Sequence, residues 1–454
     1  MKKNVLMVTL GLFVTLSMIL AACAPAATEA PAPAATEPPA AEAEMVELGG
    51  VEYSTAYDGT TVTYFSVAAD EQLRLFQSEF DEFTAATGIT VQAEGNKDFE
   101  TLILVRVEGD DAPDIAGFAQ PGLLADFVRK GNIVDLSTFL TEDFLMTKYG
   151  QGLIDLSKVD GKVAGVWHNA DVKSIVWYPK KEFDEKGYQI PQTWDELIAL
   201  SDQILADGGT PWCIGIGSEG ATGWVGTDWV EDVMLRTTTP ENYDLWTRGE
   251  LKFNSPEVKN AFDIVGEVWF KEGYVYGGVP NILTTPFGDA PDPLFDEPPK
   301  CWLHRQASFI TNFFPESAVV GVDVDYFYLP PIDPAMGKPV LGSGSIQAMF
   351  NDRPEVREVM KFLASGYSMK KEAEAGVAVA PHLDADPAWY PNDAARGFAR
   401  IIQEATTFRF DGSDLMPGAV GAGSFWTGIV EWVSANGENT DTVLQTIDDS
   451  WPAE

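Results

Sequence analysis

Strand-like and helix-like hydrophobic patterns alternate along the chain from about residue 57. Residues 61–67 (TVTYFSV) are β-branched and aromatic, which predicts a strand. The next pattern predicts a helix that Asp70 caps and that ends at Gly88. Its apolar side chains recur at helical spacing and are Leu73, Phe76, Phe80 and Phe83. The alternation of the two patterns favours an α/β lobe.

The same alternation continues over the following residues. We expect a strand at 89–95, then a helix, a turn and a buried strand within 102–118, and a short helix at 120–131. These elements predict a mostly parallel sheet with flanking helices. Residues 162–179 hold two strand-like runs with no helix between them, which we interpret as a crossover between two lobes.

Helix-start signals mark the second half of the chain. Thr193-Trp194-Asp195-Glu196 is a capping box, and proline stands at the first turn after Ser255 and after Arg353. Residues 323–329 and 339–350 again predict strands. A folded part of about 400 residues exceeds one small domain and suits two lobes.

The N-terminus predicts export. Lys2 and Lys3 precede an apolar run at 5–20, and small residues then stand directly before Cys23. This arrangement resembles the bacterial lipoprotein signal, so we expect residues 1–22 to be removed and Cys23 to be lipidated. The alternative is a simple N-terminal membrane helix, for which the apolar run is short.

Residues 23–56 are rich in Ala, Pro and Glu, and their first aromatic residue is Tyr53. Such a segment cannot bury a core, so we expect a flexible tether. The folded part would then sit outside the cytoplasmic membrane on a lipid anchor. No second long hydrophobic segment is present in the sequence, so nothing else is expected to span a membrane.

Charge and motif content exclude several function classes. The formal net charge is −39, and −41 without Lys2 and Lys3, which repels nucleic acid and anionic lipid. No Cys/His group has metal-binding spacing, and we expect neither a metal nor a cofactor. Residues 215–220 match G-x-G-x-x-G, but the residues that follow favour a structural loop over a nucleotide site. Glycoside hydrolysis needs a pair of carboxylates, but because the chain has 69 acidic residues, finding such a pair in the sequence is weak evidence for this activity.

Two cysteines, Cys213 and Cys301, remain in the expected mature domain. In an oxidising exterior we expect them to pair, and the alternative is two inert buried thiols.

Aromatic residues give the most informative signal. The chain has 13 tryptophans, and several stand in segments rich in glycine and small polar residues: Trp167, Trp224, Trp389 and Trp426. A carbohydrate site needs flat aromatic faces together with carboxylates and amides for the hydroxyls. Core packing explains any one of these tryptophans about equally well. The glycine run 418–423 before Trp426 would allow a close backbone approach.

A series of stretches, in the same order along nearly the whole mature chain from about Thr61 to Val433, resembles one family. They include 80–91, 113–127, 173–180, 191–197, 221–236, 298–310, 339–345 and 406–432. The chain resembles the extracellular solute-binding proteins of ABC importers. The stretches 221–236 (ATGWVGTDWVEDVMLR) and 406–432 resemble the branch that takes up maltose and other α-glucosides. The matching segments around Cys213 and Cys301 also favour their pairing.

The resemblance implies a two-lobed α/β fold of the type II periplasmic-binding-protein class with a ligand cleft between the lobes. Residues 57–168 and 323–370 would form the first lobe, and residues 171–320 and 373–454 the second. The lobes would close on a sugar by a hinge motion. The protein would then be a non-enzymatic monomer that delivers its sugar to membrane permease subunits.

The resemblance also implies the binding residues. The first lobe would supply Ser66, Asp70 and Gln120, and the hinge side His168, Asn169 and Asp171. The second lobe would supply Trp224, Thr227, Asp228, Asn312, Phe313, Asp414 and Trp426. Gly342 and Gly344 would allow close backbone approach, and Trp426 would stack on a glucose ring. Trp389 has no counterpart in the family.

Three rival functions remain open from the sequence. The first is an exported glycoside hydrolase, which would need two carboxylates flanking one bond. The second is a binding protein for another small polar solute, such as a polyol, glycerol-phosphate or a peptide. The neutral and acidic character of the expected site disfavours a phosphate ligand. The third is a sensory or adhesive lipoprotein that uses the same fold.

Overall fold

The computed structural model describes residues 44–452. The lipoprotein signal at 1–22 and Cys23 lie outside these residues. The expected tether, however, does not reach residue 56, because β1 (Met45–Leu48) and β2 (Val51–Ser54) form an antiparallel hairpin. Tyr53 of this hairpin is fully buried, with its ring 5.3 Å from that of Phe83. A strand can enter the core even after a polar, Ala/Pro-rich segment, and here Tyr53 supplies the anchor.

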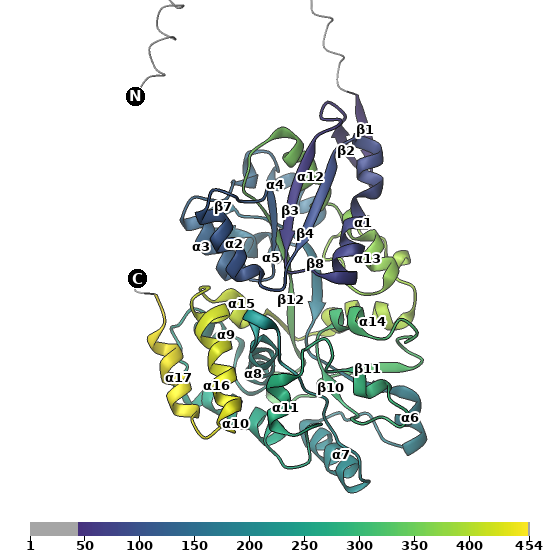
Figure 1. Ribbon diagram of the computed structural model, residues 1–454, viewed down its shortest axis with the longest axis vertical. Helices are drawn as coiled ribbons and strands as arrows, with labels where there is room; N and C mark the ends of the chain where they lie inside the picture. The colour runs from purple at the N-terminus through teal and green to yellow at the C-terminus, as the bar shows by residue number, and fades with distance from the viewer. Residues whose placement is uncertain (1–43, 453–454) are drawn as a thin grey trace, which may run out of the picture. The chain divides into compact units, whose positions relative to one another are not determined.

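The first lobe, drawn at the top of Figure 1, is built on a six-stranded sheet in the order β13-β12-β5-β3-β4, with β8 also pairing β12. Its strands are β3 (Thr61–Ser66), β4 (Thr90–Gly95), β5 (Ile115–Phe118), β8 (Val166–Val172), β12 (Pro339–Met349) and β13 (Thr407–Phe410). Pairings β3–β4, β3–β5 and β12–β13 are parallel, and β12 runs antiparallel to β5 and β8.

Helices cover this sheet much as the hydrophobic pattern predicts. In α1 (Asp70–Thr87) the predicted face buries Phe76, Phe80 and Phe83, and the helix ends at Gly88 in the left-handed conformation, φ 75°. Asp70 is not its cap, because Ala69 holds the N-cap position. Asp70 instead has φ +49°, a conformation that non-glycine residues seldom adopt.

The other helices of this lobe are short. They are α2 (Phe99–Glu108), α3 (Pro121–Arg129), α4 (Glu142–Lys148), α5 (Gln151–Leu156), α12 (Pro354–Leu363) and α13 (Lys370–Ala375), with the small hairpin β6 (Lys158–Val159) and β7 (Lys162–Val163). Except for α13, whose Ala373 packs in a small separate cluster with Tyr390 and Ala395, the apolar side chains that they bury share one core with the sheet and the N-terminal hairpin.

The second lobe is mainly helical around a three-stranded sheet in the order β10-β9-β11. Both of its pairings are antiparallel, so the expected parallel arrangement does not hold here. The strands are β9 (Ile175–Pro179), β10 (His304–Arg305) and β11 (Val324–Tyr328). The pattern at 162–179 gives β8 and β9 without a helix between them, as predicted, after the two-residue strand β7. Since β8 pairs into the first sheet and β9 into the second, the chain crosses between the sheets here.

The helices of the second lobe begin where the sequence places their start signals. Thr193 caps α7 by accepting a hydrogen bond from the Glu196 amide at 3.2 Å, and Pro256 opens α10. The helices are α6 (Lys180–Lys186), α7 (Trp194–Ala206), α8 (Trp224–Thr237), α9 (Pro240–Thr247), α10 (Pro256–Trp269), α11 (Val279–Thr284), α14 (Asp393–Glu404), α15 (Gly412–Leu415), α16 (Trp426–Ser434) and α17 (Thr440–Asp449).

The disulfide between Cys213 and Cys301 is present, with the two Cα atoms 5.5 Å apart. Both residues are buried, in a small core to which β9, β11 and α14 also contribute side chains. The pairing expected for an exported protein is therefore confirmed.

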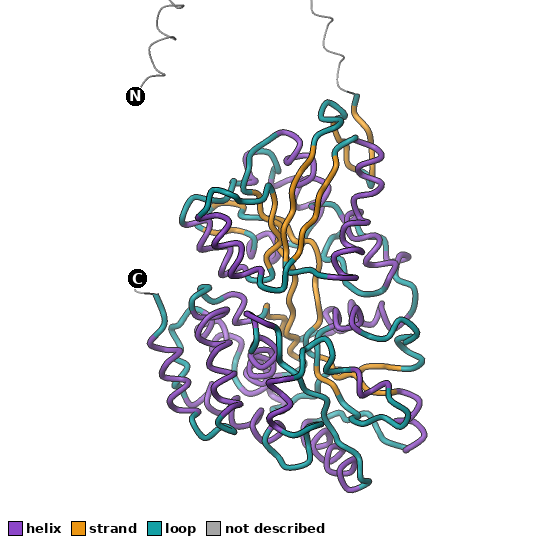
Figure 2. The backbone as a smooth tube through the Cα atoms, viewed as in Figure 1, coloured by secondary structure: helices purple, strands orange, loops and turns teal. Residues whose placement is uncertain are grey.

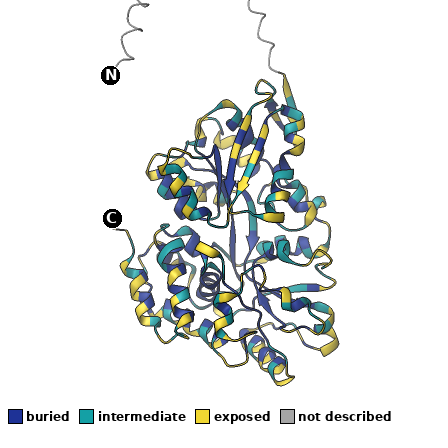
Figure 3. Ribbon diagram, in the orientation of Figure 1, coloured by how far each residue is buried: buried dark blue, intermediate teal, exposed yellow. Residues whose placement is uncertain are grey.

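Two long strands, β8 and β12, run side by side between the lobes (Figure 2). Their ladder shifts register between Ser345 and Ile346. Buried residues concentrate along these strands and inside each lobe (Figure 3). Residues at or just after the C-terminal ends of β3, β4 and β5 lie close to these two strands, between the cores of the two lobes.

Candidate functional site

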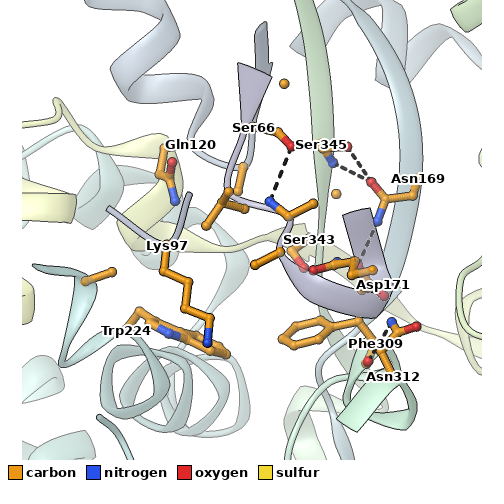
Figure 4. Close-up of a pocket in the computed structure, with 18 of the residues that line it drawn as sticks. Ser66, Lys97, Gln120, Asn169, Asp171, Trp224, Phe309, Asn312, Ser343 and Ser345 are labelled. Carbon is orange, nitrogen blue, oxygen red and sulfur yellow. Dashed lines mark hydrogen bonds between the residues drawn. The ribbon is translucent and has the colours of Figure 1, made fainter. Parts of the chain in front are cut away.

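A cavity of about 300 Å³ lies at this level and is lined by residues of both lobes. Figure 4 shows side chains entering it from several elements far apart in the sequence. This volume stands at the lower end of the range for small-molecule pockets.

The first-lobe wall is formed by residues that follow strand ends. Ser66 ends β3, and its hydroxyl oxygen accepts a hydrogen bond from the Ala68 amide at 3.3 Å. Gln120 holds the N-cap position of α3, is 6% exposed, and its Oε1 atom has no partner. Lys97 follows β4 and extends toward Trp224 (Figure 4), and its Nζ lies 3.9 Å from the Asp70 carboxylate. This wall therefore presents polar atoms that a ligand can satisfy.

The second-lobe wall is aromatic. Trp224 opens α8, and its ring lies 5.1 Å from that of Phe287 and 5.9 Å from that of Phe309. Phe313 packs edge-on against Phe287 at 5.0 Å, and Asn312 donates to the Phe309 carbonyl at 2.9 Å. All five side chains line the cavity, and the four aromatic rings among them offer the flat apolar surface that the C–H face of a sugar needs.

Polar side chains of the two crossing strands form the back of the cavity. Asn169 accepts hydrogen bonds from the Ser345 amide and hydroxyl, at 3.0 and 2.6 Å, and donates to Asp171 at 3.1 Å (Figure 4). Burial raises the pKa of Asp171 to about 7, although the Ser308 hydroxyl donates to it. Gly344 is required here, because a Cβ atom at that position would lie 2.2 Å from the Asn169 carbonyl oxygen.

Two further carboxylates, those of Glu372 and Glu100, also line the cavity. His168 lies within hydrogen-bonding distance of Glu372, with 3.0 Å between Nε2 and Oε2, and its Nδ1 is buried without a partner. Burial raises the pKa of Glu100 to about 7. His168, Glu372 and Glu100 all line the cavity.

Twelve of the fifteen residues expected to bind ligand line this cavity. They are Ser66, Asp70, Gln120, His168, Asn169, Asp171, Trp224, Asn312, Phe313, Gly344, Asp414 and Trp426. Their contacts with ligand stay a prediction.

The other three expected residues, Thr227, Asp228 and Gly342, do not line the cavity. Thr227 is fully buried, and its hydroxyl donates to the Trp224 carbonyl at 2.8 Å. Asp228 is fully buried in ion pairs. Gly342 faces the Phe408 ring, where a Cβ atom would approach to 2.3 Å. Membership of a matching segment did not reveal which helix or strand face opens to the cavity.

A buried ionic cluster lies beside the aromatic wall, and two of its members, Lys173 and Asp411, also line the cavity. The Lys173 ammonium donates to Asp228 at 2.8 Å and to Asp411. Burial opposes ionisation of Asp411, but the Lys173 ammonium lowers its pKa to about 2. Burial and the charge of Asp411 raise the pKa of Glu231. Within residues 44–452, carboxylate oxygens of Asp228, Glu231 and Asp411 lie within 4.8 Å of one another, and Lys173 forms ion pairs with two of these groups, Asp228 and Asp411.

The glycine run before Trp426 has a different role from the one expected. Residues Val420–Phe425 form a π-helical turn rather than a loop. A Cβ atom on Gly421 would lie 1.8 Å from the Ser413 carbonyl oxygen, so the close approach is to α15. Trp426 lines the cavity but is only 4% exposed, and its indole Nε1 is buried without a partner. The Trp426 ring is therefore mostly packed in the core, and only a small part of it faces the cavity.

Several lining residues carry no recognisable motif and are not among the residues that the sequence predicts for the site. They include Lys97, Glu100, Lys173, Phe287, Phe309, Ser343, Ser345, Glu372 and Ser413. Lys97 follows a predicted strand, which is the one signal that could have found it. Trp389, by contrast, packs beside Tyr367 outside the cavity.

Two α/β lobes, strands that cross between them and a cavity lined from both sides define the class of two-lobed solute-binding proteins. The chain belongs to the bacterial extracellular solute-binding protein family, whose model matches residues 69–297.

Curated relatives match most of the chain. It is 47% identical over 395 residues to the "Osmoprotective compounds-binding protein GgtB" of Synechocystis sp., covering 87% of this chain and 93% of that protein. It is 40% identical over 413 residues to the "Alpha-glucosides-binding periplasmic protein AglE" of Rhizobium meliloti, covering 88% and 89%.

Solved structures show the same fold at low sequence identity. A maltose-bound T. maritima MalE3 matches with TM-score 0.68 at 16% identity, over 86% of this chain and 98% of that one. The bacterial solute receptor AcbH, described as preferring β-D-galactopyranose, matches with TM-score 0.73 at 19% identity, over 86% and 98%.

The chain is thus the solute-binding component of an ABC importer, which works with membrane permease subunits, and it is not an enzyme. The rival interpretation as a glycoside hydrolase is therefore rejected. In the described part of the chain, no helix combines the length and apolar character needed to cross a bilayer.

Proposed function

We propose that the protein captures an α-glucoside of about two sugar rings and presents it for import. The observation that carries this proposal is the pairing of an aromatic wall, Trp224 and Phe309, with the amide and carboxylate of Asn169 and Asp171 in one cavity. A sugar ring presents an apolar face and a rim of hydroxyls, which such a pair of surfaces complements. Similarity to the α-glucoside-binding protein AglE supports the linkage type.

Cavity size favours a short ligand. A volume of about 300 Å³ corresponds to about ten water molecules at roughly 30 Å³ each. This space suits one or two sugar rings, as in maltose, trehalose or sucrose, better than a long glucan.

The charge of the cavity favours a neutral ligand. Lys97 and Lys173 are its lysines, and Lys173 is already paired with two carboxylates. The acidic lining residues are Asp70, Glu71, Glu100, Asp171, Glu372, Asp411 and Asp414. An anionic sugar would meet like charge there, so sugar phosphates are poor candidates.

A second candidate ligand is a small osmoprotective compound, which the 47% identity to GgtB favours. A thermal-shift panel separates the two candidates. It comprises maltose, trehalose, sucrose, maltoheptaose, glycerol and glycine betaine. A ligand at 100 times its dissociation constant stabilises the folded state by about 2.7 kcal/mol. We expect the disaccharides to raise the melting temperature most. A response only to glycerol or betaine would favour the second candidate, and no response to any sugar would refute the saccharide assignment.

We also propose that the protein is exported and held at the outer face of the cytoplasmic membrane by lipid on Cys23, as a monomer. The residues before Cys23 support this proposal. A Cys23→Ala variant should move from the membrane fraction to the medium or periplasm. Membrane retention of that variant, or a mature N-terminus elsewhere by mass spectrometry, would contradict the anchor. Light scattering of the purified domain measures its molar mass in solution and so tests whether it is a monomer.

A further inference from the structure

Lys173 connects the crossing strands to the wall of the cavity. It lies between β8 and β9, its backbone amide donates to the Leu341 carbonyl of β12 at 2.9 Å, and its side chain is 5% exposed. A lysine this deeply buried must have charged partners, because the cost of removing its charge from water is several kcal/mol in real proteins.

The first partners of Lys173 lie on α8. Its Nζ is 2.8 Å from Asp228 Oδ1 and 5.3 Å from the centroid of the Trp224 ring. Trp224 and Asp228 are four residues apart, so they lie on the same face of the helix about one turn apart. The ammonium therefore contacts the ring and the carboxylate together, and a cation over an indole face is attracted to it.

The second partner of Lys173 is Asp411, at the start of α15. The Asp411 carboxylate also accepts hydrogen bonds from the Ser413 hydroxyl and the Asp414 amide, both at 2.9 Å. Glu231 of α8 accepts from the amides of Gly412 and Ser413. Ser413 and Asp414 line the cavity, so the turn that carries them is held through the same ammonium.

We propose that Lys173 is a positioning residue for the solute site, which sets ligand affinity by fixing the Trp224 ring and the Asp411–Asp414 turn. This role accounts for Asp228, which the sequence places in the site but the fold buries behind it. Asp228 acts on the ligand through Lys173. The inference rests on the proposed function only for the identity of the sugars used to measure affinity.

Replacing Lys173 by methionine keeps the length of the side chain but leaves Asp228 and Asp411 without their shared cation. Asp228 keeps Arg305 at 3.5 Å, but Asp411 then lies buried beside Asp228 and Glu231 without its cation, and repulsion among these carboxylates would move α8 and the turn apart. The Trp224 ring would lose its cation and with it a fixed orientation.

Lys148→Met is the matched control. Lys148 is a buried lysine, 9% exposed, that pairs with Asp384 at 2.6 Å and lies 5.6 Å from the Phe144 ring. It does not line the cavity. The two substitutions therefore remove the same kind of interaction, once at the cavity wall and once away from the cavity.

Two measurements test the role. The first is calorimetric binding of maltose, trehalose and sucrose to the full-length exported protein and both variants. The second needs no ligand: ¹⁹F NMR of 5-fluorotryptophan-labelled protein, with the Trp224 resonance assigned by its loss in Trp224→Phe. Circular dichroism verifies that each variant is folded.

We expect Lys173→Met to shift or broaden the Trp224 resonance and to weaken sugar binding about tenfold or more, while Lys148→Met changes neither. A folded Lys173→Met variant with an unchanged Trp224 resonance and unchanged affinity would refute the positioning role. If no sugar binds the unmodified protein, the proposed function fails, and the resonance still decides the role of Lys173.

If Lys173→Met does not fold, Asp228→Asn provides the second test. This change keeps the shape of the side chain and the Lys173–Asp411 pair but weakens the hold of Lys173 on α8. The Trp224 resonance should again shift, and sugar affinity should fall by a smaller factor. An unchanged resonance in folded Asp228→Asn would refute the proposal.

Discussion

Gly223 lies directly against the backbone of Trp426, so that a Cβ atom at position 223 would be 2.2 Å from the Trp426 carbonyl oxygen. Gly223 also has φ +121° and immediately precedes Trp224. The starts of α8 and α16, each with a tryptophan in the cavity wall, are therefore packed on one another through a position that only glycine fits.

Gly223→Ala should destabilise the protein and weaken solute binding. Backbone strain and the steric clash together should cost about 3 kcal/mol or more of the free energy of unfolding. Displacement of either tryptophan should lower sugar affinity. Urea unfolding and calorimetry measure the two effects.

Gly131→Ala is the control for this prediction. Gly131 has φ +80°, but a Cβ atom there would meet nothing within 4 Å. Its substitution should cost about 1 kcal/mol through backbone strain and leave affinity unchanged. Equal losses in the free energy of unfolding for the two variants would mean that the close contact with Trp426 does not contribute to stability.

The two cavity tryptophans should respond differently to truncation. Trp224 is partly exposed, so Trp224→Ala should mainly weaken sugar binding, by about tenfold or more. Trp426 is 4% exposed, so Trp426→Ala should mainly reduce stability, by about 3–5 kcal/mol.

Trp389→Ala serves as the control, because Trp389 is also partly exposed but lies outside the cavity. It should change neither sugar affinity nor stability by a large amount. Retention of full affinity in folded Trp224→Ala would remove this ring from the proposed site.

Glu79 should make the protein less stable as the pH rises. Burial, with the nearby charge of Glu372, raises the pKa of Glu79 from 4.5 to about 9. Between these values the folded state holds a proton that the unfolded state has lost. The contribution of Glu79 to the free energy of unfolding is therefore fully present below about pH 4.5 and is lost as the pH rises toward 9. The slope from this group is up to about 1.4 kcal/mol per pH unit.

Glu79→Gln should remove that slope and stabilise the protein at pH 8, because the amide oxygen can still accept the Glu372 backbone hydrogen bond of 2.7 Å. Glu82→Gln, on an exposed position of the same helix, should not stabilise it, because hydrogen bonds from Tyr367 and Lys370 lower the pKa of Glu82. Urea unfolding between pH 5 and pH 9 gives both slopes. An unchanged slope in Glu79→Gln would assign the pH dependence to other groups.

Loss of the disulfide should reduce stability without changing the cavity. Cys213 and Cys301 are 88 residues apart, and closing a loop of this length is worth about 4–5 kcal/mol in the chain-entropy model. The double variant Cys213→Ser, Cys301→Ser should lose most of this and keep its sugar affinity, since neither cysteine lines the cavity. Unfolding with and without reductant provides the comparison, and equal stability of the unmodified protein in both would contradict the prediction.

The sequence reveals elements whose signals are local. Phe76, Phe80 and Phe83 define one face of α1, and Thr193 and Glu196 define the start of α7, because these patterns depend on residues close in the chain. Asp70 shows the limit of such signals. Aspartate is a common cap, but the backbone here places Ala69 at that position.

The cavity depends on contacts between distant segments, which local patterns do not specify. Phe309 and Lys97 come from different lobes, and no motif marks either residue. Thr227 and Asp228 stand beside Trp224 in the sequence, but the helix turns them into the interior. The family resemblance finds the right segments, and only the fold decides which side chain of each segment faces the solute.

The register shift between β8 and β12 at Ser345 has a mechanical consequence. An uninterrupted ladder resists bending, whereas an irregularity concentrates curvature where it occurs. Ser345 stands at the level of the cavity and is hydrogen-bonded to Asn169 beside it. The irregular point of the connection thus lies at the level of the cavity, and we expect the two strands to bend there if the lobes move on binding a solute.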